Sequence, residues 1–93
     1  MEIDIRHDEA QHKFVAKVDG NEAHLTYTTV DDETLEFRHT FVPSELRGRK
    51  LARQLVDAGF AYAREHGYTV IPTCSYVAKV VERTPAYQEL VAA

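Results

Sequence analysis

The stretch "FVPSELRGRKLARQL", residues 41–55, connects two different kinds of sequence pattern. It begins at the end of an alternating run that is typical of a β-strand, and Pro43 stops that run because proline has no N–H for a strand ladder. It ends inside an apolar repeat that predicts a helix. The loop between the two patterns holds one glycine, Gly48, and three cations, Arg47, Arg49 and Lys50. The fold and the function both depend on this strand-to-helix turn.

Upstream of the turn, the pattern predicts an antiparallel meander of strands at residues 12–18, 21–30 and 34–42. These segments are rich in β-branched and aromatic residues, and they alternate between apolar and polar side chains. Asp19-Gly20 is a strong hairpin signal between the first two strands. The acidic run at residues 31–33 forms the second turn.

Downstream of the turn, the pattern predicts a long helix over about residues 47–66, with a broad apolar stripe that includes Leu51. Gly67 ends this helix. A short strand at 68–71 follows, and then a second amphipathic helix at 75–84 and a closing helical turn. The order β-β-β-α-β-α predicts an α+β fold in which helices pack on a mostly antiparallel sheet.

The composition is that of one ordinary soluble domain over residues 1–93, with 44% hydrophobic and 28% charged residues. The net charge of −4 argues against nucleic acid as the main partner, because nucleic-acid-binding surfaces are usually basic. One cysteine excludes an internal disulfide and fits a reducing compartment. No apolar run reaches the roughly 20 residues of a membrane span, and the charged N-terminus is unlike a secretory signal. We therefore expect a cytoplasmic protein without membrane contact, and a monomer, although the sequence leaves the oligomeric state open.

The cations of the turn allow two interpretations. A solvated loop often carries arginine and lysine without a specific role. The alternative is a phosphate cradle, because a helix N-terminus offers free N–H groups and Gly48 lets the backbone approach an anion closely. Cations at a helix start oppose the helix dipole, and an anionic ligand would remove that conflict.

The wider pattern resembles the acetyl-CoA pyrophosphate loop of the GNAT N-acetyltransferase superfamily. That loop is written Q/R-x-x-G-x-G/A, and here it reads "RGRKLA", residues 47–52. The first and last positions match, whereas Lys50 replaces the middle glycine. From about residue 13 onward, the chain also matches a minimal, single-domain GNAT-like subfamily at His39, Thr40, Val42, Leu46, Arg47, Gly48, Pro72, Cys74, Tyr76, Val77, Pro85 and Tyr87.

This resemblance implies a GNAT-like fold, acetyl-CoA or CoA as the bound cofactor, and acetyl transfer to an unidentified amine. It implies that the end of the third strand pairs with the pantetheine arm through Thr40, Phe41 and Val42. It implies that the turn holds the diphosphate through Arg47, Gly48, Arg49, Lys50, Leu51 and Ala52. We expect Tyr76 to line the same site, and we expect no metal.

His39 is the first candidate for catalysis. It is the best base by residue type, because the unperturbed pKa of histidine is near ~6.5. Strict alternation places it on the apolar face of its strand beside Phe37 and Phe41, where a structural histidine bonded to a backbone carbonyl is the competing interpretation. Glu36 and Glu45 are alternative bases.

Cys74 is the second candidate for catalysis. It stands at the start of the predicted second helix, where a helix N-terminus lowers the pKa of a thiol. We expect Thr73 or Ser75 to be the N-cap residue of that helix. A small buried hydrophobe is the competing role for this cysteine. The tyrosine general acid of many larger GNAT enzymes has no counterpart, because Glu82 stands at that spacing, and Tyr76 is a nearby substitute.

Three functions therefore stay open. The first is a small acetyl-CoA-dependent N-acetyltransferase. The second is a CoA-binding protein with little or no transferase activity, because a chain of 93 residues leaves little to shape an acceptor pocket. The third is a small nucleic-acid-binding domain that uses the cationic turn, which the net charge disfavours.

Overall fold

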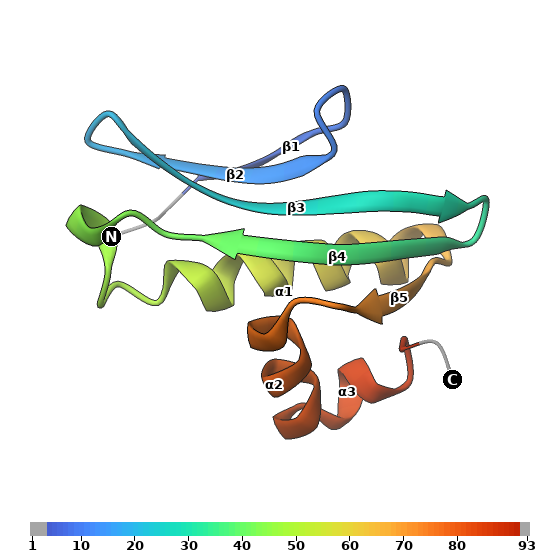
Figure 1. The fold of residues 1–93 in the computed structure, drawn as a ribbon. Coiled ribbons are helices and arrows are strands. Elements are labelled where there is room, and N and C mark those ends of the chain that lie inside the picture. Colours follow the sequence, from blue (N-terminus) through green and yellow to red (C-terminus); the bar gives the residue numbers. More distant parts are fainter. Residues whose placement is uncertain (1–3, 92–93) are drawn as a thin grey trace.

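The computed structural model describes residues 4–91, which form one five-stranded sheet with helices packed on one face (Figure 1). The elements in chain order are β1 (Ile5–Asp8), β2 (Lys13–Val18), β3 (Asn21–Asp31), β4 (Thr34–Phe41), the 3-10 helix η1 (Ser44–Leu46), α1 (Leu51–His66), β5 (Thr69–Pro72), α2 (Ser75–Arg83) and α3 (Pro85–Gln88). The strand order is β1-β2-β3-β4-β5, and every neighbouring pair is antiparallel except β4 and β5. The predicted α+β fold class is confirmed. Among the described helices, none is long and apolar enough to cross a membrane.

Strand β1 is absent from the sequence prediction, and it has only four residues. Its inward side is formed by Ile5, which packs against the core, and by His7, whose ring stacks on Phe14 with centroids 4.3 Å apart. The His7 Nε2 lies 2.5 Å from the Tyr27 hydroxyl. Burial lowers the pKa of His7 and raises the pKa of Tyr27 to about 12. Both groups therefore stay neutral near pH 7. At this position a neutral histidine packs where sequence patterns lead one to expect an apolar residue.

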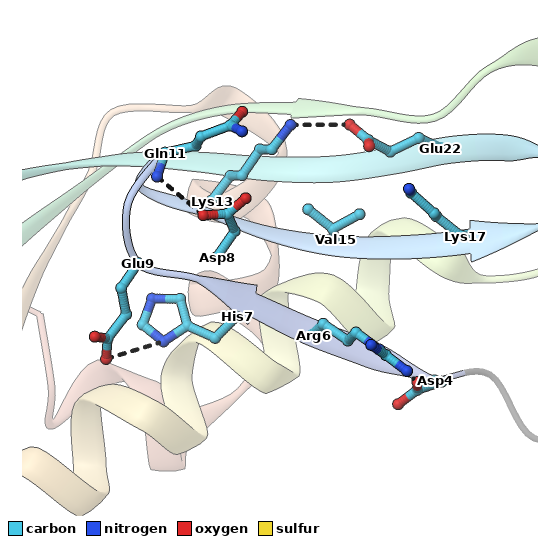
Figure 2. A pocket seen from close by; sticks show the side chains of 10 residues that line it. All are labelled: Asp4, Arg6, His7, Asp8, Glu9, Gln11, Lys13, Val15, Lys17 and Glu22. Carbon is cyan, nitrogen blue, oxygen red and sulfur yellow. Dashed lines mark hydrogen bonds and ion pairs between the residues drawn. The ribbon is translucent and has the colours of Figure 1, made fainter.

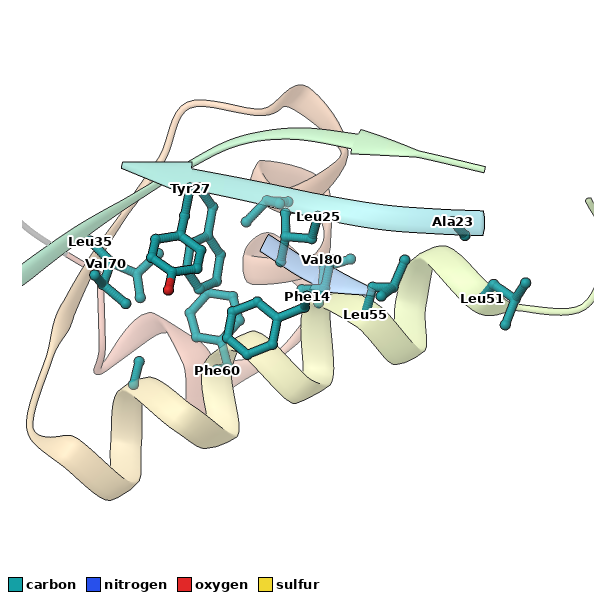
Figure 3. Close-up of a cluster of buried hydrophobic side chains, with 14 of the residues drawn as sticks. Phe14, Ala23, Leu25, Tyr27, Leu35, Leu51, Leu55, Phe60, Val70 and Val80 are labelled. Carbon is teal, nitrogen blue, oxygen red and sulfur yellow. The ribbon is translucent and has the colours of Figure 1, made fainter. Parts of the chain in front are cut away.

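The core lies between one face of the sheet and the apolar stripe of α1 (Figure 3). Leu25 and Phe37 from the sheet and Phe60 from α1 are fully buried, and the Phe37 and Phe60 rings meet edge-on at 5.3 Å. Helix α1 approaches the sheet so closely that a Cβ on Gly59 would lie 2.9 Å from the Phe37 ring. Val77 of α2 belongs to the same buried cluster. The predicted stripe is confirmed, and α1 starts at Leu51 rather than at about residue 47 because η1 and a loop precede it.

A β-bulge in β4 corrects the predicted faces of that strand. Tyr27 of β3 pairs with Phe37, and the preceding residue, Thr26, pairs with His39, so that Arg38 is an extra residue. Arg38 and His39 are both exposed, and Phe41 is 43% exposed. The prediction that His39 and Phe41 share the apolar face with Phe37 is wrong, because the extra residue reverses the alternation after Phe37.

The same bulge marks the place where β4 and β5 separate. The two strands pair in parallel from Thr34 and Thr69 up to Phe37 and Pro72, and within the described chain the pairing stops there. Strand β4 continues to Phe41 without a neighbour on that side, while the chain after β5 turns into α2 (Figure 1). Within the described chain, the edge of β4 beyond Phe37 therefore has no paired strand on the β5 side, and we call the place where the two strands separate the gap.

Candidate functional site

The turn between β4 and α1 folds as a compact loop anchored in the core. Leu46 of η1 is only 1% exposed, and it fixes the loop against the start of α1. Beside it lies a small cavity of about 150 Å³, lined by Val42, Leu46, Arg47, Gly48, Lys50, Leu51 and Ala52. The turn residues that the sequence assigned to the diphosphate site thus surround one cavity, with the exception of Arg49.

Among residues 4–91, no side chain caps the N-terminus of α1. Its N-cap residue is Lys50, and its first turn contains no acidic residue. The first N–H groups of a helix have no partner inside the helix and carry a partial positive charge. Gly48 has φ +85, a conformation that favours glycine and that opens the backbone before the helix. This end of α1 can therefore accept an anion through backbone N–H groups.

The three cations of the loop are not equivalent. Arg47 Nε lies 3.5 Å from the carbonyl oxygen of Val42, and Arg49 lies 3.8 Å from a carboxylate oxygen of Asp19. No carboxylate among residues 4–91 lies within ion-pair distance of Lys50. Neither Arg47 nor Lys50 thus has a carboxylate partner in the described chain, and Lys50 stands at the helix end where a positive charge is least favourable.

Lys50 occupies the position of the middle glycine in the sequence motif, and its backbone explains why that position favours glycine. Its φ and ψ are 59 and 27, which is the left-handed region. A side chain other than glycine costs roughly 1–2 kcal/mol there. The departure from the motif therefore keeps the loop geometry and adds strain and a charge to it.

Cys74 lies across the gap from β4. It is itself the N-cap residue of α2, so the expectation of Thr73 or Ser75 in that place is wrong. Its N–H donates to the carbonyl of Phe37 at 3.0 Å, and its Sγ lies 3.5 Å from the Thr40 hydroxyl. Burial of the Cys74 thiol opposes ionisation, but hydrogen bonds from the Thr40 hydroxyl and from the backbone N–H groups at the helix start lower its pKa.

The other predicted residues lie around this gap on different sides. His39 is exposed, and its carbonyl accepts the Thr26 hydroxyl at 3.3 Å, so the bulge separates it from the thiol side of the sheet. Tyr76 of α2 is half-buried against the core. Glu45 is exposed and bonded to its neighbour Ser44 at 2.7 Å. The site therefore joins Thr40 to Cys74 and leaves His39 and Glu45 facing solvent.

Sequence reasoning missed one contact at the gap. The Thr73 hydroxyl donates to Glu36 Oε2 at 2.5 Å, and it connects the end of β5 to β4. The two residues are 37 positions apart, and neither has a motif that predicts the pairing. The pairing depends on the parallel register of β4 and β5, which places Glu36 beside Ile71 and which the sequence does not specify.

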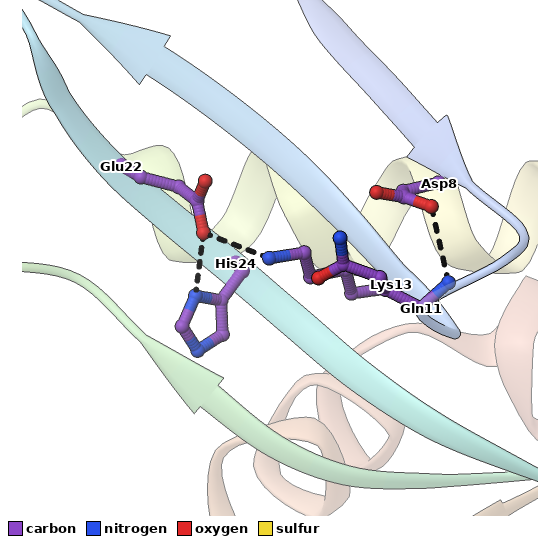
Figure 4. A network of polar contacts seen from close by, with 5 residues as sticks. All are labelled: Asp8, Gln11, Lys13, Glu22 and His24. Atoms are coloured by element: carbon purple, nitrogen blue, oxygen red, sulfur yellow. Dashed lines mark hydrogen bonds and ion pairs between the residues drawn. The ribbon is translucent and has the colours of Figure 1, made fainter.

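The open face of the sheet carries a larger hollow of about 700 Å³ over β1, β2 and β3 (Figure 2). Its charged side chains pair with one another: Arg6 Nε lies 2.9 Å from Asp4, and Lys13 Nζ lies 3.1 Å from Glu22. Glu22 also lies 3.3 Å from His24 Nδ1 (Figure 4). Because these pairs satisfy most of the charges that line the hollow, we assign the candidate site to the β4–α1 turn and not to this hollow.

The environment of Cys74 gives a prediction for its pH dependence. The thiolate is the reactive form, so the rate of alkylation by iodoacetamide rises with pH through the pKa of the thiol. Because the folded protein lowers this pKa, the midpoint should lie below that of a free thiol, about 8.5. Thr40→Val removes a hydrogen bond to the thiolate and should move the midpoint to higher pH, whereas Thr40→Ser should not. A midpoint that is the same in all three proteins would exclude the Thr40 contact as a cause.

The strain at Lys50 gives a prediction for stability. Lys50→Gly should raise the free energy of unfolding by about 0.5–1 kcal/mol, because the left-handed strain it relieves exceeds the entropy that glycine adds to the unfolded chain. Lys50→Ala removes the charge and keeps the strain, so it should raise stability by less. Urea unfolding measures both variants. An equal gain in the two would assign the cost to the charge at the helix end rather than to the backbone.

Comparisons with known proteins identify the family to which this chain belongs. A family model described as GCN5-related N-acetyl-transferase matches residues 13–90. Protein NATD1 of Xenopus tropicalis is 32% identical over 90 residues, which cover 95% of this chain and 83% of NATD1, and NATD1 of Homo sapiens is 31% identical over 90 residues, which cover 95% and 80%. The solution NMR structure of a GCN5-like protein from Staphylococcus aureus matches with a TM-score of 0.76 and 29% identity, covering 97% of this chain and 88% of that one. The chain therefore belongs to the GCN5-related N-acetyltransferase family.

Proposed function

We propose that the protein is an N-acetyltransferase that binds acetyl-CoA between β4 and the starts of α1 and α2 and transfers the acetyl group to an amine. One observation carries this proposal: the free edge of β4 runs from an uncapped, cationic helix start to a thiol of lowered pKa. Membership of an N-acetyltransferase family supports acetyl-CoA as the donor.

At the loop end, the residues fit a diphosphate. The cavity of about 150 Å³ lies at the N-terminus of α1, where backbone N–H groups and the helix dipole favour an anion. Lys50 adds a cation without a protein partner in the described chain. Bound phosphate would offset the conflict between the Lys50 charge and the helix dipole, which gives the cationic loop a physical reason to exist in an acidic protein.

Along the strand, the residues fit the arm of the donor. Beyond the bulge, backbone groups of Thr40 and Phe41 have no β5 partner on the side of the gap. Such an edge can pair with amide groups of a ligand in the way that a further strand would. A strand N–H near the bulge would then donate to the thioester oxygen as negative charge develops on it during attack.

At the acetyl end, we favour direct attack. The amine nitrogen forms a bond to the thioester carbon, the carbon–sulfur bond breaks, CoA leaves as the thiolate, and the amine proton passes to water or to a base. Cys74 lines this end beside Thr40. Its lowered pKa makes it a better leaving group than an ordinary thiol, and acetyl transfer to Cys74 would exchange one thioester for another of similar energy. His39 is exposed on the other face and is not needed as a base for the thiol.

Titration with CoA tests the binding site. We expect CoA to shift the amide resonances of residues 40–42 and 47–52, and RNA to leave them unchanged. Gly48→Pro should weaken CoA binding more than Lys50→Ala, because proline removes an N–H and cannot adopt φ +85, whereas Lys50 contributes a side chain. Lys17→Ala makes the same charge change on β2 and should have no effect. Unshifted amides at residues 47–52 would remove the loop from the site.

The route of acetyl transfer is tested by Cys74→Ala. Direct attack predicts that turnover with a working amine is retained in this variant within about tenfold, because the thiol only lines the site. It also predicts no acetyl adduct in the intact mass of the wild-type protein after addition of acetyl-CoA. A +42 Da adduct (about one acetyl group) on Cys74 that the amine discharges, together with loss of turnover in Cys74→Ala, would instead establish a covalent intermediate.

A further inference from the structure

The point where β4 and β5 separate is crossed by three bonds in the described chain. In the plane of the sheet, the Cys74 N–H donates to the Phe37 carbonyl at 3.0 Å. The Thr40 hydroxyl lies 3.5 Å from the Cys74 Sγ. The Thr73 hydroxyl donates to Glu36 Oε2 at 2.5 Å. Together these bonds close the narrow end of the gap.

The two side-chain bonds lie on opposite faces of the sheet. Thr40 pairs with Leu25 of β3, which is fully buried, so its side chain is on the helix face. Glu36 pairs with Thr28, which is the outward neighbour of the buried Tyr27, so its side chain is on the open face. The Thr40–Cys74 contact therefore closes the narrow end of the gap on the helix face, and the Glu36–Thr73 bond closes it on the open face.

We propose that the Glu36–Thr73 bond is the end wall of the donor site and sets the length of the acyl chain that the site accepts. This inference rests on the proposed function, in which CoA enters from the β4–α1 loop and its acyl group points along β4 toward the bulge. The free edge, residues 38–41, is about 13 Å long at the usual rise of a strand. An acyl group at its end lies against Thr40 and Cys74 on one face and against Glu36 and Thr73 on the other.

A closed wall at this place favours a short acyl group. A pocket that fits one chain discriminates against each additional methylene by roughly tenfold or more when it cannot expand. The Glu36–Thr73 bond is charge-assisted, and it lies at the exposed surface of the sheet. The other Glu36 carboxylate oxygen lies 3.6 Å from Arg38 Nη1. Loss of the Glu36–Thr73 bond should allow longer chains to pass over the open face.

The experiment compares the affinities of CoA, acetyl-CoA and hexanoyl-CoA by calorimetry. Wild-type protein should bind acetyl-CoA at least about tenfold more tightly than hexanoyl-CoA. Thr73→Val and Glu36→Ala should each reduce this ratio by about threefold or more, and the double variant should reduce it no further, because both remove the same bond. Their affinity for free CoA should match the wild type, since the wall touches only the acyl group.

The matched controls separate a wall from a general loss of structure. Thr73→Ser keeps the hydroxyl and Glu36→Gln keeps an acceptor oxygen, so both should keep the wild-type ratio. Thr29→Val makes the same substitution at an exposed position of β3 and should also keep it. If free CoA binds normally but the acetyl-CoA to hexanoyl-CoA affinity ratio is unchanged in Thr73→Val and Glu36→Ala, the end wall alone is overturned. The same follows if the wild-type protein shows no preference for acetyl-CoA over hexanoyl-CoA. Failure of free CoA to bind overturns the proposed function and the end wall with it.

Discussion

The extra residue in β4 is the constraint on which the rest of the site depends. Without the bulge at Arg38, Thr40 would face the open side of the sheet and His39 would face the core. With it, Thr40 turns toward Cys74, and the strand bends where its pairing with β5 ends. One added residue thus places a hydroxyl beside the thiol and separates two parallel strands at the same point. The local twist of a bulge gives both effects a single cause.

A second constraint acts at the other end of the free edge. Helix α1 must start with a left-handed residue because the chain leaves η1 in an extended conformation and then reverses into the helix. Glycine would satisfy this backbone with little strain, but Lys50 stands there. A strained lysine at the positive end of a helix lowers the stability of the ligand-free protein twice, through its backbone and through its charge. Strained residues of this kind are typical of functional sites, where a residue is kept for its function although it lowers stability.

The fold could be predicted from the sequence because its core follows simple periodicities. The stripe of α1 and the alternation in β3 are regular, and the predicted helix and strands are confirmed, although β2 buries three consecutive residues. Strand β1 was not predicted, because it has only four residues and a polar residue, His7, forms part of its inward side through its contact with Tyr27. The faces of β4 beyond Phe37 were predicted wrongly, because a bulge shifts the period by one residue and leaves no mark in the composition of the strand.

In the candidate site, the part formed by the backbone could be predicted from the sequence and the part formed by side-chain pairs could not. The turn that we propose to bind an anion is visible in the sequence, because Pro43 and Gly48 signal a particular backbone path and the path itself supplies the N–H groups. The proposed acetyl end is made of pairs that are distant in the chain, Thr40 with Cys74 and Glu36 with Thr73. Such pairs depend on the register between strands, which a single sequence does not specify. Sequence reasoning therefore predicts where the donor would be held in this family more readily than which side chains enclose its reactive end.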